Sequence, residues 1–411
     1  FGEALLLVGL LLTVAAALSG LMHGTVLSIS VLSVALGMGL ASVDVVSIEP
    51  REKAVVELVE LALVLTLLSD GLFVERELLR MHWGPVARAI VVAMPLTMLL
   101  LALAAKLLFT GLSWAEAFLL GAALSPTDPV VTSSVVTSSR VPSLVRHTLN
   151  LESGLNDGLA LPFVLFFLVL AEPGGGASGE AVKLLGEAIA GAAIGAALGW
   201  AGGQLHDKVP GGGITRRYEG IFAVGLGLVA FGLADVTIGN GLVAAFVAGI
   251  ALGVTSHEIP DAFVDFSENV SAIFQVLTFF VFGALIVTTG YGDPIWPLLL
   301  FIPFALLIAR PLAIFVSFIR LRLPRPHEVF IAWFGPKGVA SMLFALFILN
   351  SQAPDRSQVF DIAAFVILIS IAAHGFTDTI GATWIARRMR DQEERPPEAD
   401  PGLASGTGAM P

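Results

Sequence analysis

Two short polar stretches interrupt apolar parts of the chain, and their residue types suit the binding of a small cation. The first stretch reads Leu124-Ser125-Pro126-Thr127-Asp128-Pro129. Each of its two prolines lacks a backbone amide hydrogen and disfavours the helical conformation of the preceding residue. We therefore expect an unwound segment whose carbonyls, Thr127 and Asp128 present hard oxygen ligands. The alternative is an ordinary proline kink beside a solvated Asp128, and the two flanking prolines argue against it.

The second polar stretch reads Leu151-Glu152-Ser153-Gly154-Leu155-Asn156-Asp157-Gly158. On a helix, Glu152 and Asn156 share one face, and Ser153 and Asp157 share another. Two carboxylates inside lipid repel each other and are costly unless one of them has a cationic partner. Arg310 lies in the middle of a later apolar run and can bind a carboxylate through two hydrogen bonds. We expect this pairing to neutralise one acid and to leave the other free to bind and release protons.

A third interruption contains a cation. Its sequence is Phe334-Gly335-Pro336-Lys337-Gly338, within the apolar run 329–350, and we expect local unwinding there as well. Two interrupted helices at corresponding positions of two halves are typical of transporters with inverted repeats and a site near the membrane midplane. Along the chain they are the fifth and the twelfth apolar runs.

The composition excludes several classes of protein. Of the 411 residues, 56% are hydrophobic and 13% are charged, whereas soluble chains carry about 25% charged residues. The chain is therefore not a soluble enzyme, a disordered protein or a nucleic-acid binder. The absence of cysteine excludes disulfides, zinc-thiolate sites and thiol nucleophiles. Phosphate-binding, metalloprotease and dinucleotide motifs do not occur in their required context, so we expect neither an enzyme nor a cofactor.

The apolar residues form runs of the length that crosses a membrane, which is about 17–25 residues. We identify about thirteen: 4–22, 26–47, 54–74, 84–109, 113–138, 148–171, 182–205, 219–235, 238–255, 268–289, 295–319, 329–350 and 358–385. Helices satisfy their own backbone groups inside lipid. We therefore predict an all-α polytopic membrane protein with about thirteen transmembrane helices, two of them broken and crossing.

The positive charges indicate the orientation. Alternate loops and the tail hold fifteen of the 22 Lys and Arg residues, and the other loops hold five. The fifteen are Arg76, Arg80, Arg88, Arg140, Arg146, Lys208, Arg216, Arg217, Arg320, Arg322, Arg325, Arg387, Arg388, Arg390 and Arg395. Positive residues concentrate on the cytoplasmic side. We expect the N-terminus outside and the C-terminus in the cytoplasm, where the acidic tail 391–411 is disordered.

The remaining conspicuous residues have structural interpretations. Glycines repeat every four residues from Gly191 to Gly203 and predict a close helix contact. Asn240 is expected to cap a helix. Ionisable residues near run ends are expected to lie at the membrane interface and to be solvated: Glu57, Glu60, Glu116, Asp235, Asp361 and Asp378, with His147 and His374.

These motifs together resemble the monovalent cation/proton antiporters of the NhaP and sodium/proton exchanger type. The matching pieces are Ser125-Pro126-Thr127-Asp128-Pro129-Val130, Glu152-Ser153-Gly154-Leu155-Asn156-Asp157-Gly158 and Gly335-Pro336-Lys337-Gly338. Leu67-Leu68-Ser69-Asp70-Gly71 and the segment 240–249 extend the resemblance over residues 1–390. The resemblance implies a homodimer. Each protomer would have a mobile core of residues 84–171 and 295–385 and a dimerisation scaffold of residues 1–75 and 182–289.

The resemblance also implies roles for individual residues. Asp157 would be the carrier that binds either a proton or a cation, with Asn156 shaping the site. Glu152 and Arg310 would form the structural ion pair. Lys337 would lie at the broken helix, at a position where this type often has arginine.

A second set would supply oxygen ligands to the monovalent cation. Besides Asp157, these are Thr127, Asp128 and Ser153, directly or through water, and Asp70 near the cation path. No cofactor is implied.

The function that follows is an exchange of Na⁺ or Li⁺ for H⁺ by alternating access across the plasma membrane. Burial favours the protonated form of a carboxyl, and a nearby cation favours the ionised form. One carboxylate can therefore bind a proton and a cation in turn. One titrating carboxylate predicts electroneutral exchange. K⁺/H⁺ exchange on the same scaffold, a cation channel or sensor, and a membrane enzyme are the alternatives, in decreasing order of support.

Overall fold

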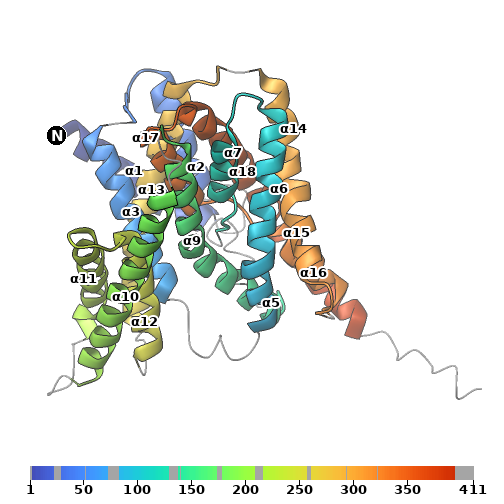
Figure 1. Cartoon of the computed structure of the whole chain (residues 1–411). Coiled ribbons are helices and arrows are strands. Elements are labelled where there is room, and N and C mark those ends of the chain that lie inside the picture. Colours follow the sequence, from blue (N-terminus) through green and yellow to red (C-terminus); the bar gives the residue numbers. More distant parts are fainter. Residues whose placement is uncertain are drawn as a thin grey trace, which may run out of the picture.

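The structure is a computed structural model that describes residues 2–22, 29–50, 52–72, 83–128, 138, 140–173, 178–208, 216–256, 261–292, 294–321 and 323–393. Helices make up most of these residues, and the described part has no strand (Figure 1). The predicted all-α fold is thereby confirmed.

Each predicted apolar run contains at least one helix. In chain order the elements are α1 (Gly2–Met22), α2 (Ile29–Ser42), α3 (Lys53–Leu72), α5 (Trp83–Arg88), η1 (Ala89–Ala93), α6 (Met94–Leu108), α7 (Trp114–Ala123), α9 (Ser143–Ala171), α10 (Ser178–Lys208), α11 (Arg216–Asp235), α12 (Gly241–Thr255), α13 (Asp261–Thr289), α14 (Ile295–Pro303), η3 (Phe304–Ala309), α15 (Arg310–Ser317), α16 (Arg325–Trp333), α17 (Val339–Asn350) and α18 (Arg356–Glu393). The two η elements are π-helical turns inside long helices.

Seven helices among the described residues are long and apolar enough to cross a membrane, and five shorter apolar helices accompany them. The outer faces of these helices are apolar too. On α14, η3 and α15, for example, the exposed side chains include Leu299, Leu300, Leu307, Ile308 and Leu312. Lipid surrounds such a surface, so the chain is a multi-pass membrane protein. The count of thirteen crossings and the inverted repeats stay predictions.

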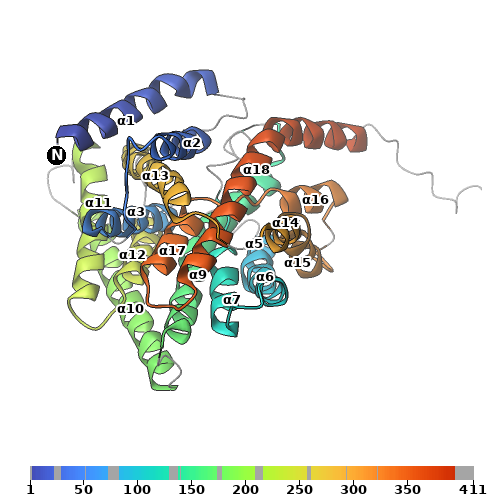
Figure 2. The same cartoon turned by 90° about the horizontal axis from the view of Figure 1, so that it is seen from above.

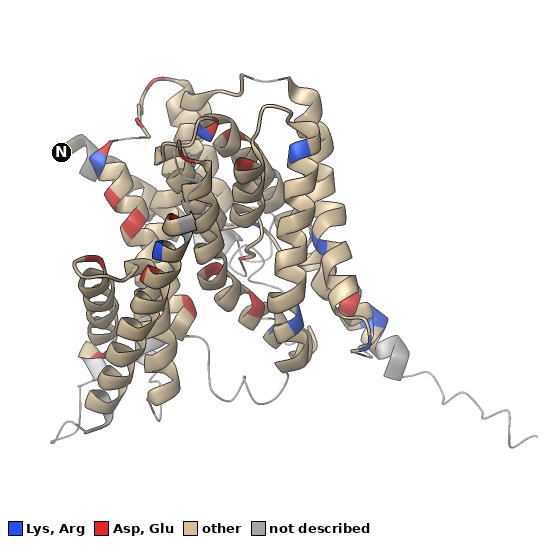
Figure 3. Cartoon of the chain, viewed as in Figure 1, with Lys and Arg blue, Asp and Glu red and all other residues tan. Residues whose placement is uncertain are grey.

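The helices form two groups when the molecule is seen from above (Figure 2). Helices α1, α2, α3 and α10 to α13 lie on one side, and α5, α6 and α14 to α16 lie on the other. Helices α7, α9, α17 and α18 run between these groups, and the unwound segments described below adjoin α7 and α17. In Figure 3 most of the length of the peripheral helices is free of charged residues, which suits a lipid environment.

Three glycines of α10 let it pack directly on the backbone of α12. A β-carbon built at Gly191, Gly195 or Gly199 would lie 2.2–2.4 Å from a carbonyl oxygen of residues 240–248. Only glycine permits this approach. Asn240 caps α12, since its Oδ1 accepts a hydrogen bond of 3.0 Å from the amide of Val243. Both sequence interpretations are confirmed.

The end of α18 differs from the expected boundary of the tail. The helix continues past Arg390 to Glu393, so it includes the first three residues assigned to the tail. Residues 394–411, which make up the rest of the expected tail, lie outside the described residues. The same holds for 129–137, the second half of the fifth apolar run.

Replacing Gly195 with alanine should destabilise the protein. The new β-carbon would meet the Ala244 carbonyl oxygen at 2.2 Å, and overpacking costs about 1–3 kcal/mol. Thermal unfolding in detergent measures the effect.

The matched control is Gly186→Ala on the same helix, where a β-carbon would meet nothing within 4 Å. Because alanine favours a helix over glycine, this variant should unfold at the same or a higher temperature. Equal stability of both variants would contradict the packing argument.

Candidate functional site

The two unwound segments lie against each other. Residues 124–128 follow α7, residues 334–338 precede α17, and neither segment is helical. The amide of Asp128 donates a 2.9 Å hydrogen bond to the carbonyl of Pro336. The Oδ2 atom of Asp128 accepts a 2.9 Å hydrogen bond from the amide of Val339, the first residue of α17. The unwinding expected at both places is present in the described residues.

Each segment places a charge at the end of a helix that belongs to the other segment. The carboxylate of Asp128 lies at the N-terminus of α17. The ammonium of Lys337 donates to the carbonyls of Ser125 at 3.4 Å and Pro126 at 3.2 Å, just after the C-terminus of α7. Since a helix has a positive N-terminal and a negative C-terminal end, both placements are favourable. Each segment is thus held to the other by a charged side chain at a helix end.

Two glycines make this contact sterically possible. A β-carbon at Gly338 would lie 1.9 Å from Oδ2 of Asp128, and one at Gly335 would lie 1.9 Å from Nε of Arg310. The sequence Gly-Pro-Lys-Gly therefore does more than break a helix, because its glycines make room for an acid and a guanidinium.

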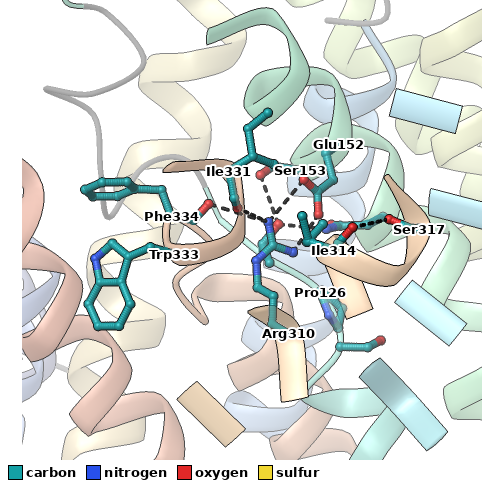
Figure 4. A network of polar contacts seen from close by, with 12 residues as sticks. Pro126, Glu152, Ser153, Arg310, Ile314, Ser317, Ile331, Trp333 and Phe334 are labelled. Atoms are coloured by element: carbon teal, nitrogen blue, oxygen red, sulfur yellow. Dashed lines mark hydrogen bonds and ion pairs between the residues drawn. The ribbon is translucent and has the colours of Figure 1, made fainter. Parts of the chain in front are cut away.

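Arg310 and Glu152 form a buried ion pair with two hydrogen bonds (Figure 4). The distances from Nη1 to Oε1 and from Nη2 to Oε2 are 2.6 and 3.1 Å. Only 7% of the Arg310 side chain and 4% of the Glu152 side chain are exposed. Nη2 also lies 3.3 and 3.5 Å from the carbonyls of Ile331 and Phe334. The pair therefore joins α9, α15 and the end of α16, and all the charge of Glu152 is matched.

The position of Arg310 depends on a π-helical turn. Arg310 directly follows η3, and Pro311 supplies no amide hydrogen to the helix. A π-helical turn inserts an extra residue into a helix and rotates the face that follows it, and such turns are frequent at functional sites. The fourth apolar run has the same feature, because η1 is followed by Pro95.

A group of hydroxyl and amide side chains connects the first unwound segment with α9. The Nδ2 atom of Asn156 donates a 2.8 Å hydrogen bond to Oγ1 of Thr127. The same oxygen lies 3.2 Å from Oγ of Ser153. All three residues are buried. They come from two of the sequence stretches, which the fold brings together.

Three acceptor oxygens remain beside this group. Oδ1 of Asp157, Oδ1 of Asn156 and Oδ2 of Asp70 are buried and have no hydrogen-bond partner among the described residues. Asp70 of α3 packs against α9 at Gly154, where a β-carbon would lie 3.4 Å from the Asp70 carbonyl oxygen. The charges of Asp70, Asp128 and Lys337 all act on Asp157. A proton or a cation is the chemical complement of such a group of acceptors.

Several residues expected at the interface are buried instead. Glu116, Asp361, Asp378 and His374 are each at most 9% exposed. The Glu116 carboxylate accepts hydrogen bonds of 2.9 Å from the amides of Ser113 and Asp355, which ties the start of α7 to the segment before α18. The expectation that they are solvated is therefore wrong for these four. Glu57 and Asp235 are exposed and Glu60 and His147 are half-buried, and the place of all these residues at the membrane interface stays a prediction.

His374 is one of the residues whose environment the sequence analysis missed. The available signal was spacing, since Ser370, His374 and Thr377 follow one another at helical intervals within the run 358–385. A polar stripe on an apolar helix indicates a polar contact with a neighbour.

Comparison with known proteins gives concordant results. The family described as "Sodium/hydrogen exchanger, transmembrane" matches residues 9–383. A "K(+)/H(+) antiporter NhaP" of Alkalimonas amylolytica is 28% identical over 330 residues, which are 79% of this chain and 56% of that protein. A "Na(+)/H(+) antiporter 2" of Zygosaccharomyces rouxii is 28% identical over 375 residues, or 78% of this chain and 44% of that protein. The chain thus spans about half the length of these curated relatives.

A solved structure has the same fold. The sodium proton antiporter MjNhaP1 from Methanocaldococcus jannaschii superposes with a TM-score of 0.78 at 19% identity. The match covers 93% of this chain and 98% of the other. The helical architecture therefore extends to a protein of remote sequence.

Replacing Glu152 with glutamine should reduce the amount of folded protein. The change leaves the Arg310 guanidinium buried without its counter-charge, and breaking a buried pair costs about 3–5 kcal/mol. The yield of monodisperse protein and its unfolding temperature in detergent measure the loss.

Glu57→Gln is the control, because Glu57 pairs with Lys53 at 3.5 Å on the surface, where a pair contributes about 0–1 kcal/mol. An abundant and stable Glu152→Gln protein that does not transport would assign this acid to the transport reaction instead.

Proposed function

Because the chain belongs to the sodium/hydrogen exchanger family, we propose that it exchanges a monovalent cation for protons across a membrane, with Asp157 as the carrier residue. It acts as a transporter and not as an enzyme. The relatives' names, which include both K⁺/H⁺ and Na⁺/H⁺ antiporters, support cation/proton exchange as the general reaction.

The observation that carries the proposal is the contrast between two acids one and a half turns apart on α9. Glu152 is held by two hydrogen bonds from a permanently charged arginine. Asp157 is equally buried, yet its Oδ1 has no donor among the described residues. An ionised carboxylate in this position is costly. It is stabilised when it binds a proton or a metal cation, and these two ligands compete.

The neighbouring oxygens suit a bare or partly hydrated alkali cation. Thr127 and Ser153 offer hydroxyl oxygens, Asn156 offers an amide oxygen, and Asp70 offers a second carboxylate. Asp128 is already engaged at the N-terminus of α17, so it acts on the cation mainly through its charge. Lys337 partly offsets the acidic charge, and its positive charge favours the ionised form of Asp157, which is the form that binds a cation.

Transport then follows from the charge balance. With a proton or a cation bound, Asp157 is neutralised and the loaded site can move through the low-dielectric interior. The bare carboxylate moves poorly because of its desolvation cost. Exchange is therefore obligatory, and the two ions travel in opposite directions. Residues 84–171 and 295–385 form the mobile core that carries the site.

The remaining assignments rest on the family resemblance. Residues 1–75 and 182–289 form the scaffold through which two copies associate as a homodimer. The protein lies in the plasma membrane with its N-terminus outside. Na⁺ or Li⁺ is the proposed substrate. K⁺ is the second candidate, favoured by the NhaP relatives that are named K⁺/H⁺ antiporters.

Replacing Asp157 with asparagine should abolish exchange. An amide does not take up a proton near neutral pH, and it lacks the negative charge that holds a cation. The purified protein is reconstituted in proteoliposomes, and dissipation of a pH gradient is followed after addition of Na⁺, Li⁺ or K⁺. We expect at least a hundredfold loss of rate, in line with about 3 kcal/mol for a lost ionic contact.

Asp235→Asn is the matched control, since this aspartate is exposed, and it should exchange at the wild-type rate. Exchange by the Asp157→Asn protein would remove Asp157 from the carrier role. Which of the three cations dissipates the gradient identifies the substrate.

The presence of Asn156 beside a single carrier acid predicts one cation for one proton. Net charge then does not cross the membrane, so an imposed membrane potential should leave the initial rate unchanged within about twofold. Proteoliposomes with equal ion concentrations on both sides are a second test, because in them only the membrane potential could drive net proton movement. Uphill proton movement driven by the potential alone would show that the exchange is electrogenic.

A further inference from the structure

His374 lies in a buried hydrogen-bond network that the ion site does not use. Its Nδ1 is 2.8 Å from the Ser370 carbonyl oxygen and 3.3 Å from the Ser370 hydroxyl. Its Nε2 is 3.0 Å from the carbonyl oxygen of Trp333. The residue is 2% exposed. Trp333 is the last residue of α16, so the imidazole links α18 to the point where the second unwound segment begins.

The donors of this network can be assigned in order. The amide of Lys337 donates a 2.9 Å hydrogen bond to Oγ of Ser370. The Ser370 hydroxyl keeps its own hydrogen and can donate it to Nδ1 of His374. Both ring nitrogens face carbonyl oxygens, Nδ1 that of Ser370 and Nε2 that of Trp333. A neutral imidazole has one N–H and donates to one of these carbonyls, and a doubly protonated ring donates to both. With the hydrogen on Nε2, the Trp333 carbonyl accepts it and Nδ1 can accept from the Ser370 hydroxyl, while the Ser370 carbonyl receives no hydrogen from the ring.

The indole of Trp333 adds two more contacts with α18. It stacks on the imidazole, with ring centroids 5.0 Å apart and planes inclined by 26°. Its Nε1 donates a 3.0 Å hydrogen bond to Oγ1 of Thr377. Ser370, His374 and Thr377 lie on one face of α18 at intervals of four and three residues. This face, which we call the α18 clamp, therefore holds residues 333–337 from one side.

The backbone of the unwound segment is divided between the clamp and the ion site. The carbonyls of Phe334 and Pro336 face the ion site, where they accept hydrogen bonds from Arg310 and from the amide of Asp128. The carbonyl of Trp333 and the amide of Lys337 face α18. Buried backbone groups must be paired. The clamp supplies the partner of the Lys337 amide and a second contact for the Trp333 carbonyl, which also accepts a 2.9 Å hydrogen bond from the amide of Gly335.

We propose that Ser370 and His374 are positioning residues that set the cation affinity of the site. By fixing the backbone of Lys337 they direct its ammonium to the carbonyls of Ser125 and Pro126. Its charge then reaches Asp157 from one fixed place. The inference rests on the proposed function, in which Asp157 binds the cation. Without the clamp, the segment keeps its contacts with Arg310 and Asp128, but Lys337 loses its fixed position. Its positive charge then favours the ionised form of Asp157 less, so the proton competes better and cation binding weakens.

Two substitutions at His374 separate hydrogen bonding from packing. His374→Phe keeps an aromatic ring against Trp333 and removes both polar nitrogens. His374→Gln keeps one donor and one acceptor and cannot become charged. In proteoliposomes of the full chain, we expect His374→Phe to raise the KM for the transported cation about three- to tenfold, as for one or two lost hydrogen bonds, with the maximal rate changed less. His374→Gln should restore the KM to within about twofold of wild type.

Ser370→Ala is an independent test that removes a single hydroxyl and preserves the helix. It should raise the KM in the same direction as His374→Phe. Thr383→Ala, one turn or more beyond the clamp on α18, should leave the KM unchanged. A wild-type KM in both Ser370→Ala and His374→Phe overturns the proposal. Equal impairment of His374→Gln and His374→Phe overturns it too, because a side chain that keeps one donor and one acceptor would then not replace the imidazole.

Hydrogen–deuterium exchange tests the clamp without any transport. In the purified protein, the peptide that contains residues 333–339 should exchange faster in Ser370→Ala and His374→Phe than in wild type, while peptides of α10 should not change. Unchanged exchange of that peptide refutes the clamp, even if the wild-type protein transports cations. Faster exchange in a protein whose wild type transports nothing would refute the proposed function and leave the clamp standing.

Discussion

The cost of a charge inside lipid governs the centre of this molecule. An arginine, a lysine and four acids lie at the meeting point of α3, α7, α9, α15 and α17, and most of these charges are balanced by a specific partner. Arg310 balances Glu152, Lys337 lies on the carbonyl end of α7, and Asp128 lies on the amide end of α17. Asp157 and Asp70 each keep an oxygen without a donor among the described residues. Under the proposed function, the balance of the surrounding charges leaves these carboxylates available for ions.

The two unwound segments allow that balance. A continuous helix satisfies its own backbone groups and offers nothing to an ion or to a neighbouring helix. Once the helices are broken, their ends become partial charges that need compensation, and each segment provides the compensating side chain for the other. Glycines permit the approach, because β-carbons at Gly335 and Gly338 would overlap with Arg310 and Asp128. The site is therefore a contact between two unwound segments. The Arg310–Glu152 ion pair and the α18 clamp hold the second of these segments in place.

The helices outside this centre are held together by a different principle. Glycines of α10 meet the backbone of α12, and the same kind of contact joins α3 with α12 through Gly71 and Gly249. These contacts depend on close fit and not on charge. Under the proposed function, the tightly fitted group of helices is the scaffold that stays fixed, and the group built around buried polar contacts is the core that moves.

The sequence by itself determined the helical class, because long apolar runs have one solution in lipid. It also determined where the helices break, because proline and glycine act on the local backbone. Tertiary structure decided what those breaks do. Sequence spacing relates residues on one helix only, and the pairs that matter here, such as Asp128 with Val339 or Ser370 with Lys337, join residues 33 to 211 positions apart. His374 shows the limit most clearly. As a residue in an apolar run it suggested an interface, and its buried place became visible only when α16 and α18 were packed together.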